Sequence, residues 1–145
     1  AVAVQAVGGS RSSLGIPVDD VMNTLTEHRG PAGPLTISLS QNLVQRTAER
    51  RLRVIGEGGE VSLDLLAGRL DAVRQDGRRV RHDFRGHPRN TMFLDAMRHF
   101  IDPAQRRMPT EIPIAVGARV LRTALAARRA AETGERIILE SPGEP

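Results

Sequence analysis

Short segments in which apolar and polar residues alternate fill the first 84 residues, and this period of two predicts β-strands. Turn-forming runs separate most of these segments, for example Gly30–Pro34, Gly56–Gly59 and Gln75–Gly77. Strands joined by short turns form hairpins, so the sequence predicts an antiparallel sheet. The predicted strands are Ala1–Val7, Val21–His28, Leu35–Val44, Arg51–Ile55, Glu60–Leu66, Arg69–Arg74 and Arg79–Phe84.

The alternation is strict in the third of these strands. Successive side chains of a strand point to opposite faces of the sheet. The aliphatic residues of this strand therefore lie on one face and the hydroxyl residues on the other. The two sets are Leu35, Ile37 and Leu39, and Thr36, Ser38 and Ser40. One face of the sheet is expected to be semi-polar.

After residue 87 the apolar period becomes that of a helix. Asn90 is the expected N-cap and Pro103 the expected end of this first helix. Its apolar stripe consists of Phe93, Met97, Phe100 and Ile101, and packing in a core is expected to explain both phenylalanines.

A second helix is expected to begin at Thr110, an N-cap followed by Glu111, and to end at Gly134 as C-cap. Pro113 fits its first turn, where a missing N–H costs little. The segment Arg136–Leu139 then returns to the sheet as a short strand. The predicted fold class is α+β, with an open-faced, predominantly antiparallel sheet and two main helices on one face. Residues 1–145 are expected to form a single domain.

The composition excludes several kinds of chemistry. The chain has no cysteine and, although it has 21 basic residues, no lysine, so thiolate sites, cysteine nucleophiles and lysine Schiff bases are excluded. No apolar run approaches the roughly 20 residues that span a bilayer, and no signal peptide is recognisable, so we expect a cytoplasmic protein without a membrane partner.

Candidate sites within the chain are weak, and we predict no catalytic, cofactor-binding or metal-binding residue. Gly8–Gly9 follows a strand, but the dinucleotide fingerprint Gly-x-Gly-x-x-Gly is absent. Gly56–Gly59 leads into a strand, where no helix N-terminus can hold a phosphate. Asp19–Asp20 could bind a cation or a sugar hydroxyl, although the entry to a strand is the favoured interpretation.

Histidines and arginines offer two further candidates. His82 and Asp83 could form a metal cluster with His87, but His87 belongs to an expected loop and a metal site needs ligands on rigid elements. The arginines form four short clusters, yet the chain has three phenylalanines and neither Tyr nor Trp to stack bases, so no nucleic-acid partner is expected. A solvated arginine surface is the better interpretation.

The order of these segments resembles the C-terminal domain of the glucose–fructose oxidoreductase and inositol dehydrogenase (Gfo/Idh/MocA) family. The resemblance covers nearly the whole chain. After an opening strand, the segments that carry it are Asp20–Gly30, the strand ending in Ser38–Ser40, Val54–Asp64 with its Gly-x-x-Gly turn, Phe93–Asp102, Pro109–Thr110, the Ala-rich helix, and Gly134–Leu139.

The resemblance implies a dihydrodipicolinate-reductase-like or glyceraldehyde-3-phosphate-dehydrogenase-like C-terminal domain. Members of the family pair such a domain with an N-terminal Rossmann domain and use NAD or NADP to oxidise or reduce sugars, polyols and related molecules. The Rossmann glycines, the Glu-Lys-Pro lysine and the Asp-x-x-x-His element of the family are absent from this chain. We therefore transfer no catalytic residue.

Two hypotheses follow. The first is a substrate-binding and oligomerisation domain that is inert without its nucleotide-binding partner domain. The open sheet face would then pack on another subunit through Thr36, Ser38 and Ser40. The second is a stand-alone module that binds a ligand, a protein or nucleic acid on the same face.

Overall fold

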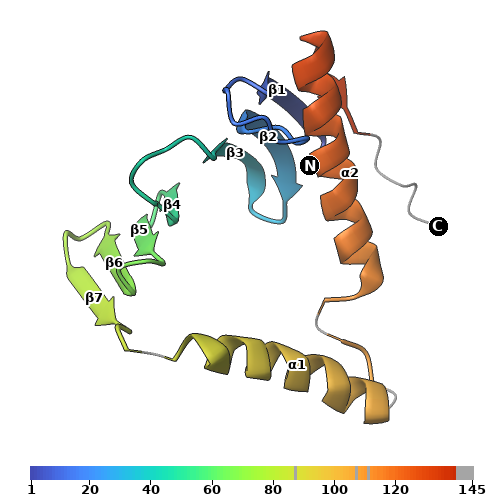
Figure 1. Cartoon of the computed structure of the whole chain (residues 1–145). Coiled ribbons are helices and arrows are strands. Elements are labelled where there is room, and N and C mark those ends of the chain that lie inside the picture. Colours follow the sequence, from blue (N-terminus) through green and yellow to red (C-terminus); the bar gives the residue numbers. More distant parts are fainter. Residues whose placement is uncertain (87, 107, 111, 140–145) are drawn as a thin grey trace. The chain divides into compact units, whose positions relative to one another are not determined.

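A computed structural model describes residues 1–86, 88–106, 108–110 and 112–139 (Figure 1). These residues group into two compact units: unit 1 comprises residues 1–46 and 111–145, and unit 2 comprises residues 47–110. All described strand pairs are antiparallel, and each unit contributes one helix. The predicted α+β class is confirmed, while the single domain stays a prediction.

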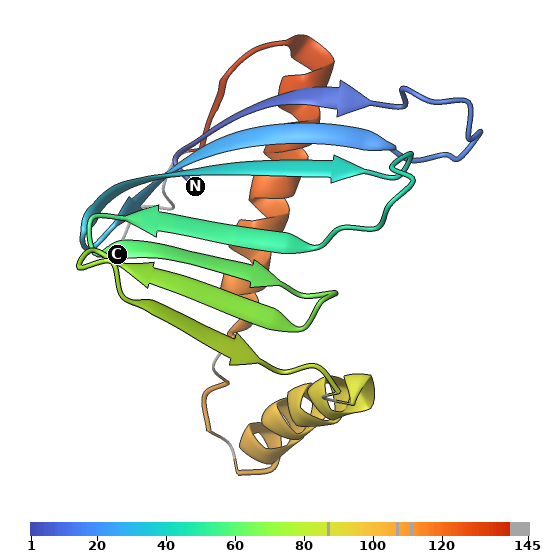
Figure 2. The ribbon, with the colours of Figure 1, turned by 90° about the vertical axis from the view of Figure 1, so that its left-hand side faces the viewer.

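Unit 1 is a four-stranded sheet with one helix packed on it. Its strand order is β3-β2-β1-β8, so the last strand returns to the sheet, as predicted, and pairs there with the first strand. The helix of the unit lies against β1 (Figure 2). The elements are β1 (Ala3–Gly9), β2 (Val21–Gly30), β3 (Gly33–Asn42), α2 (Ile114–Thr133) and β8 (Ile137–Ile138).

The core of unit 1 is small and built from small side chains. Val4 and Ala6 of β1 pack against three alanines of α2, and Val4 and Ala130 are fully buried. Short side chains on both surfaces let the helix approach the sheet closely, which compensates for the small area each residue buries. The three alanines are Ala126, Ala127 and Ala130.

The C-terminal cap of α2 is as predicted and the N-terminal cap is not. Gly134 adopts a left-handed conformation with φ of 73°, and its N–H donates to the Ala130 carbonyl at 2.8 Å. At the other end Pro113, not Thr110, is the N-cap, with an extended ψ of 155°. Because proline disfavours the helical region for the residue before it, the helix begins only after Pro113. Glu111 lies outside the described residues.

Unit 2 is a second four-stranded sheet, in the order β4-β5-β6-β7, followed by the helix α1. The sequence predicted one continuous sheet, and the described ladder hydrogen bonds instead join the strands into two groups of four. Residues 43–50, which separate the groups, consist of bends and irregular backbone. The elements are β4 (Arg51–Gly56), β5 (Gly59–Asp64), β6 (Arg69–Arg74), β7 (Arg79–Asp83) and α1 (Arg89–Arg106).

The first helix differs from its prediction in three respects. It begins at Arg89, so Asn90 lies inside the first turn, and it continues through Pro103 to Arg106. A proline removes one helical hydrogen bond without preventing the following residues from staying helical. Within the described residues of unit 2, α1 makes no extensive contact with the strands, and Met97 and Phe100 are more than half exposed. The expected core packing of this stripe is therefore wrong in this structure.

The turn between β4 and β5 depends on one of its glycines. Gly56 pairs with Gly59, and Gly59 has φ of +139°, which L side chains rarely adopt. A Cβ at this position would lie 2.2 Å from the Val73 carbonyl oxygen on β6. Gly58 has neither restriction, because no atom lies within 4 Å of a Cβ added there.

We predict that Gly59→Ala destabilises unit 2 by about 2 to 4 kcal/mol, because backbone strain adds to a steric clash. The matched variant Gly58→Ala should change the free energy of unfolding by less than about 0.5 kcal/mol. Urea unfolding followed by circular dichroism measures both values. Equal stabilities of the two variants would contradict the described turn.

Candidate functional site

The predicted interface residues lie on the face of the unit 1 sheet that is opposite α2. Ser38 pairs with Leu25 of β2, and Leu25 pairs with Gln5 of β1. Side chains at paired positions point to the same face. The structure thus places the predicted hydroxyl residues together, on a surface that we call the open face. The open face consists of Gln5, Val7, Asn23, Leu25, Glu27, Thr36, Ser38 and Ser40.

The open face combines apolar groups with polar groups that are mostly uncharged. Val7 is 71% exposed and Leu25 is 42% exposed, so the face presents aliphatic surface to solvent. A shallow hollow of about 480 Å³ is centred on it, lined by Gln5, Asn23 and Ser38 among others. These polar side chains can exchange hydrogen bonds with a partner, and the charged Glu27 is already paired with Arg136 at 2.8 Å.

The opposite face of the sheet contains a larger groove between α2 and strands β2 and β3. Its volume is about 710 Å³, and we call it the α2 groove. Ile37 and Leu39 line it, which confirms the predicted separation of aliphatic and hydroxyl residues in this strand. The groove exists because α2 packs on β1 and leaves the aliphatic side chains of β3 exposed. The other principal lining residues are Met22, Thr24, Thr26, His28, Leu43, Val120, Thr123 and Leu125.

His28 is a titratable side chain that lines the α2 groove. Its Nε2 shares a hydrogen bond of 2.9 Å with Thr26 Oγ1, and Thr26 is itself buried. Partial burial lowers the pKa of His28, and the positive charge of the Ala1 amino group lowers it further. The neutral imidazole is therefore favoured.

Of the adjacent candidates Asp19 and Asp20, Asp20 serves the fold. It is 2% exposed, and its carboxylate accepts hydrogen bonds from the Arg11 N–H at 2.7 Å, the Ser12 N–H at 2.9 Å and the Ser12 hydroxyl. The bond from the Ser12 hydroxyl, with help from the Arg11 N–H, lowers the pKa of Asp20. These bonds fix the loop between β1 and β2, so little of the carboxylate remains for a cation or a sugar.

The candidate glycines also serve the fold, because they lie in strands and hairpin turns. Gly8 and Gly9 belong to β1, where they pair with Met22 and Val21 of β2, and a loop rather than a helix follows them. A dinucleotide phosphate needs the N–H groups of a helix N-terminus at this place. Gly56 and Gly59 close the β4–β5 hairpin.

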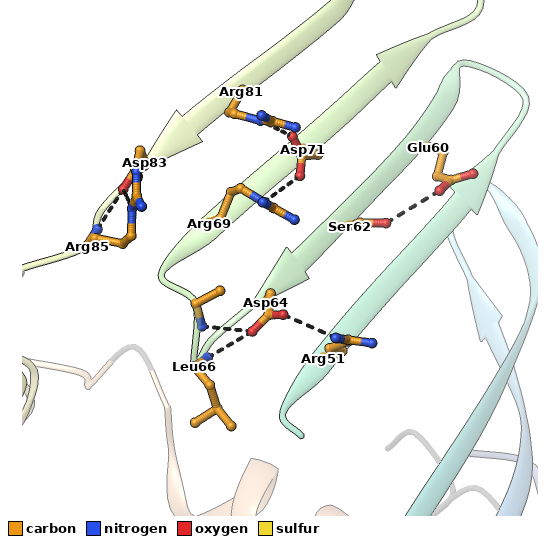
Figure 3. A network of polar contacts seen from close by, with 11 residues as sticks. Arg51, Glu60, Ser62, Asp64, Leu66, Arg69, Asp71, Arg81, Asp83 and Arg85 are labelled. Atoms are coloured by element: carbon orange, nitrogen blue, oxygen red, sulfur yellow. Dashed lines mark hydrogen bonds and ion pairs between the residues drawn. The ribbon is translucent and has the colours of Figure 1, made fainter. Parts of the chain in front are cut away.

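Arginines in unit 2 are paired with carboxylates on one face of the sheet. Figure 3 shows Asp71 between two of them, with Arg69 Nε at 2.9 Å and Arg81 Nε at 2.6 Å. Arg53 binds Glu60 with 2.6 Å between Nη2 and Oε2. This pairing supports the interpretation of the arginine clusters as solvated surface, because neighbouring acids offset their positive charge.

The same ion pairs lower the pKa values of the acids. The Arg85 side chain, with help from the Arg85 backbone N–H, lowers the pKa of Asp83 to about 2. The guanidinium of Arg81 lowers the pKa of Asp71. These groups are exposed, so each pair stabilises the fold only slightly.

The remaining metal candidates do not form a cluster within the described part of the chain. His82 and Asp83 are consecutive on β7, so their side chains point to opposite faces. His87 lies outside the described residues. No group of three or more His, Asp or Glu side chains among the described residues is arranged to hold a metal ion.

Sequence reasoning missed the α2 groove. The alternation in β3 separates Ile37 and Leu39 from the hydroxyl residues of that strand. It does not show that α2 leaves Ile37 and Leu39 uncovered. The alternation Met22, Thr24, Thr26, His28 in β2 was the available signal, since it places a second row of side chains on the same face.

The pKa of His28 gives a prediction about pH. Its folded value lies below the unfolded value of 6.5, so the unfolded chain binds the proton more tightly and stability falls as pH drops below about 6.5. The carboxylates with lowered pKa contribute only below about pH 4.5, where they titrate in the unfolded chain. Between pH 7.5 and 5 the free energy of unfolding of the chain should fall, and that of the His28→Gln variant should fall less. Equal losses for the two proteins in urea unfolding would refute a lowered pKa at His28.

Comparison with known proteins places this fold among oxidoreductases. No protein-family model matches the sequence, and no curated protein matches it either. Among solved structures, the aldose-aldose oxidoreductase of Caulobacter crescentus, complexed with glycerol, matches 95% of the chain with 24% identity and a TM-score of 0.74. An oxidoreductase of Agrobacterium radiobacter, in complex with NAD⁺, L-tartaric acid and magnesium, matches 94% with 16% identity and a TM-score of 0.78.

The chain spans only 41% and 43% of the lengths of these two proteins. Neither described helix of the chain is long and apolar enough to cross a membrane. Over nearly its whole length, the chain shares its fold with part of each of these two oxidoreductases.

Proposed function

We propose that this chain is the C-terminal substrate-binding and oligomerisation domain of an NAD(P)-dependent oxidoreductase of the Gfo/Idh/MocA family. The substrate class is a sugar, a polyol or a similar small molecule. The observation that carries the proposal is the match of 95% of this chain to 41% of an aldose-aldose oxidoreductase. A chain that folds like less than half of such an enzyme supplies one of its parts. The cytoplasmic location stays a prediction.

The cofactor belongs to the remainder of the parent protein. The NAD⁺ in the Agrobacterium structure supports NAD or NADP for the parent. The glycines at the end of β1 do not fit a dinucleotide, because Gly8 and Gly9 lie in an antiparallel ladder and a loop, not a helix, follows them. The chain alone is accordingly expected to be inert.

The contribution of this chain to oligomerisation is assigned to the open face. Thr36, Ser38 and Ser40 are exposed there beside Val7 and Leu25, and an apolar centre with polar neighbours suits an interface between copies. A two-fold axis would bring the same face of both subunits together. The alternative, a stand-alone module that binds a ligand, protein or nucleic acid on this face, makes different predictions.

The first test concerns the cofactor and the gene. We expect no change in NADH or NADPH fluorescence when the isolated chain is titrated to about 100 μM, well above typical cofactor affinities. The coding sequence should extend upstream through a Gly-rich strand–turn–helix and a Glu-Lys-Pro triplet. Micromolar cofactor binding by this chain alone, or a start codon close to Ala1, would count against the proposal. Salt-dependent binding to DNA or RNA would favour the alternative.

The second test concerns the open face. Ser40→Arg places a charge on the open face, whereas Gln41→Arg places the same charge on the neighbouring position that lines the α2 groove. If the open face forms the dimer, Ser40→Arg should weaken self-association of the isolated chain by at least about tenfold, because two like charges are buried across the axis. Gln41→Arg should leave it unchanged. Sedimentation equilibrium measures both, and a monomeric unsubstituted chain at high concentration would refute the dimer.

A further inference from the structure

Four charged residues cross the unit 2 sheet in a row, and the sign of the charge alternates along it. Arg51 of β4 pairs with Asp64 of β5, and Asp64 pairs with Arg69 of β6. Arg69 in turn pairs with Asp83 of β7. Paired positions point to the same face of a sheet, so the four side chains share one face (Figure 3). We call these four residues the charge row. The two arginines and two aspartates balance, so only the pattern of the row can select a partner.

We propose that the charge row is a recognition surface for the same row of a second copy of this chain. The inference deepens the proposed oligomerisation, on which it rests for the presence of a second copy. It assigns to the contact between copies a further surface, in unit 2, and the register of that surface.

A two-fold axis makes the charge row complementary to itself. The axis runs parallel to the strands, between β5 and β6, and stacks the same sheet face of both copies. Strand β4 of one copy then lies over β7 of the other, and β5 lies over β6. Arg51 faces Asp83 of the second copy, and Asp64 faces Arg69 of the second copy. Because the axis applies each contact twice, every member of the row meets a residue of opposite charge.

The side chains of the row can bridge two stacked sheets. Such sheets lie about 10 Å apart, and side chains from both inner faces fill the space between them. The arginine side chains of the row are exposed, Arg51 by 65% and Arg69 by 46%. Arg69 binds Asp71 through Nε, and a guanidinium with five N–H donors can bind a second carboxylate at the same time. The pairs within each copy can therefore persist when a second copy binds.

The next row of the same face does not oppose this contact. The axis places Arg53 opposite Arg81 of the second copy, but each arginine already has an acid in its own copy. Arg53 Nη2 lies 2.6 Å from Glu60 Oε2, and Arg81 Nε lies 2.6 Å from Asp71 Oδ1. Ser62, which carries no charge, faces Asp71 of the second copy. The charge row therefore sets the register, because electrostatic complementarity selects between alternative arrangements.

Charge reversal at the two ends of the row gives a direct test, because Arg51 and Asp83 cannot pair within one chain. Two strands lie between them, which separates them by about 14 Å. Arg51→Asp and Asp83→Arg each bring like charges together across the axis. Each variant alone should self-associate at least about tenfold more weakly than the unsubstituted chain. An equimolar mixture of the two should associate at least about tenfold more tightly than either alone, because each contact between the two variants again joins opposite charges.

Arg74→Asp is the matched control. Arg74 lies five positions after Arg69 on β6, so its side chain points to the other face of the sheet. This variant should self-associate like the unsubstituted chain, and mixing it with Asp83→Arg should restore nothing. Asp64→Arg mixed with Arg69→Asp repeats the test at the centre of the row, in case an end variant fails to fold. Circular dichroism checks folding, and sedimentation equilibrium at about 0.15 M ionic strength measures association.

The outcomes separate this inference from the proposed function. A mixture that associates no more tightly than its single variants overturns the inference. If Ser40→Arg weakens association in the same experiments, the proposed dimer through the open face stands. A chain that is monomeric at high concentration overturns both the inference and the proposed dimer.

Discussion

The close packing of α2 on β1 is the contact on which unit 1 depends. Val4 and Ala6 meet Ala126, Ala127 and Ala130, and these five residues form the buried apolar core of the unit. Alanine brings the helix near the sheet, but it buries little area per residue. The contact also brings β8 back to β1, since the C-cap at Gly134 turns the chain towards the pairing of Ile138 with Ala3.

The narrow contact between α2 and β1 affects the rest of the sheet. A narrow helix contact covers β1 and leaves the aliphatic residues of β3 exposed, so these residues line a groove instead of a core. The opposite face carries aliphatic and mostly uncharged polar groups. The two solved oxidoreductases with this fold are longer than the chain, which spans 41% and 43% of their lengths.

Electrostatics plays a different role in unit 2. The arginines of β4, β6 and β7 lie opposite or beside acids on neighbouring strands, so a strongly basic sequence yields a face of paired charges (Figure 3). Cross-strand pairs of this kind fix the register more than they add stability. The charge of the chain is therefore a poor guide to its partners, and the function has to be inferred from the fold and its uncovered surfaces.

Local patterns were enough to find the strands, because alternation and turn chemistry act over a few residues. All seven predicted strands of the first 84 residues exist, and the returning strand pairs with β1. The pleat of the strand was enough to predict two opposite faces in β3, one with Ile37 and Leu39 and the other with Thr36, Ser38 and Ser40. Gly134 was identifiable as a C-cap for the same reason, since its role depends on its own backbone conformation.

The tertiary structure decided what these faces meet. The sequence alone expected Phe100 in a core, whereas this side chain is exposed. Asp20 does lie at the entry to a strand, as expected, but only the structure shows that its buried carboxylate holds a loop. The spacing of apolar residues shows which side of an element is apolar. It does not show whether another element covers that side. Coverage depends on contacts between residues far apart in the chain, such as Val4 with Ala130, and no local pattern encodes their distance or angle.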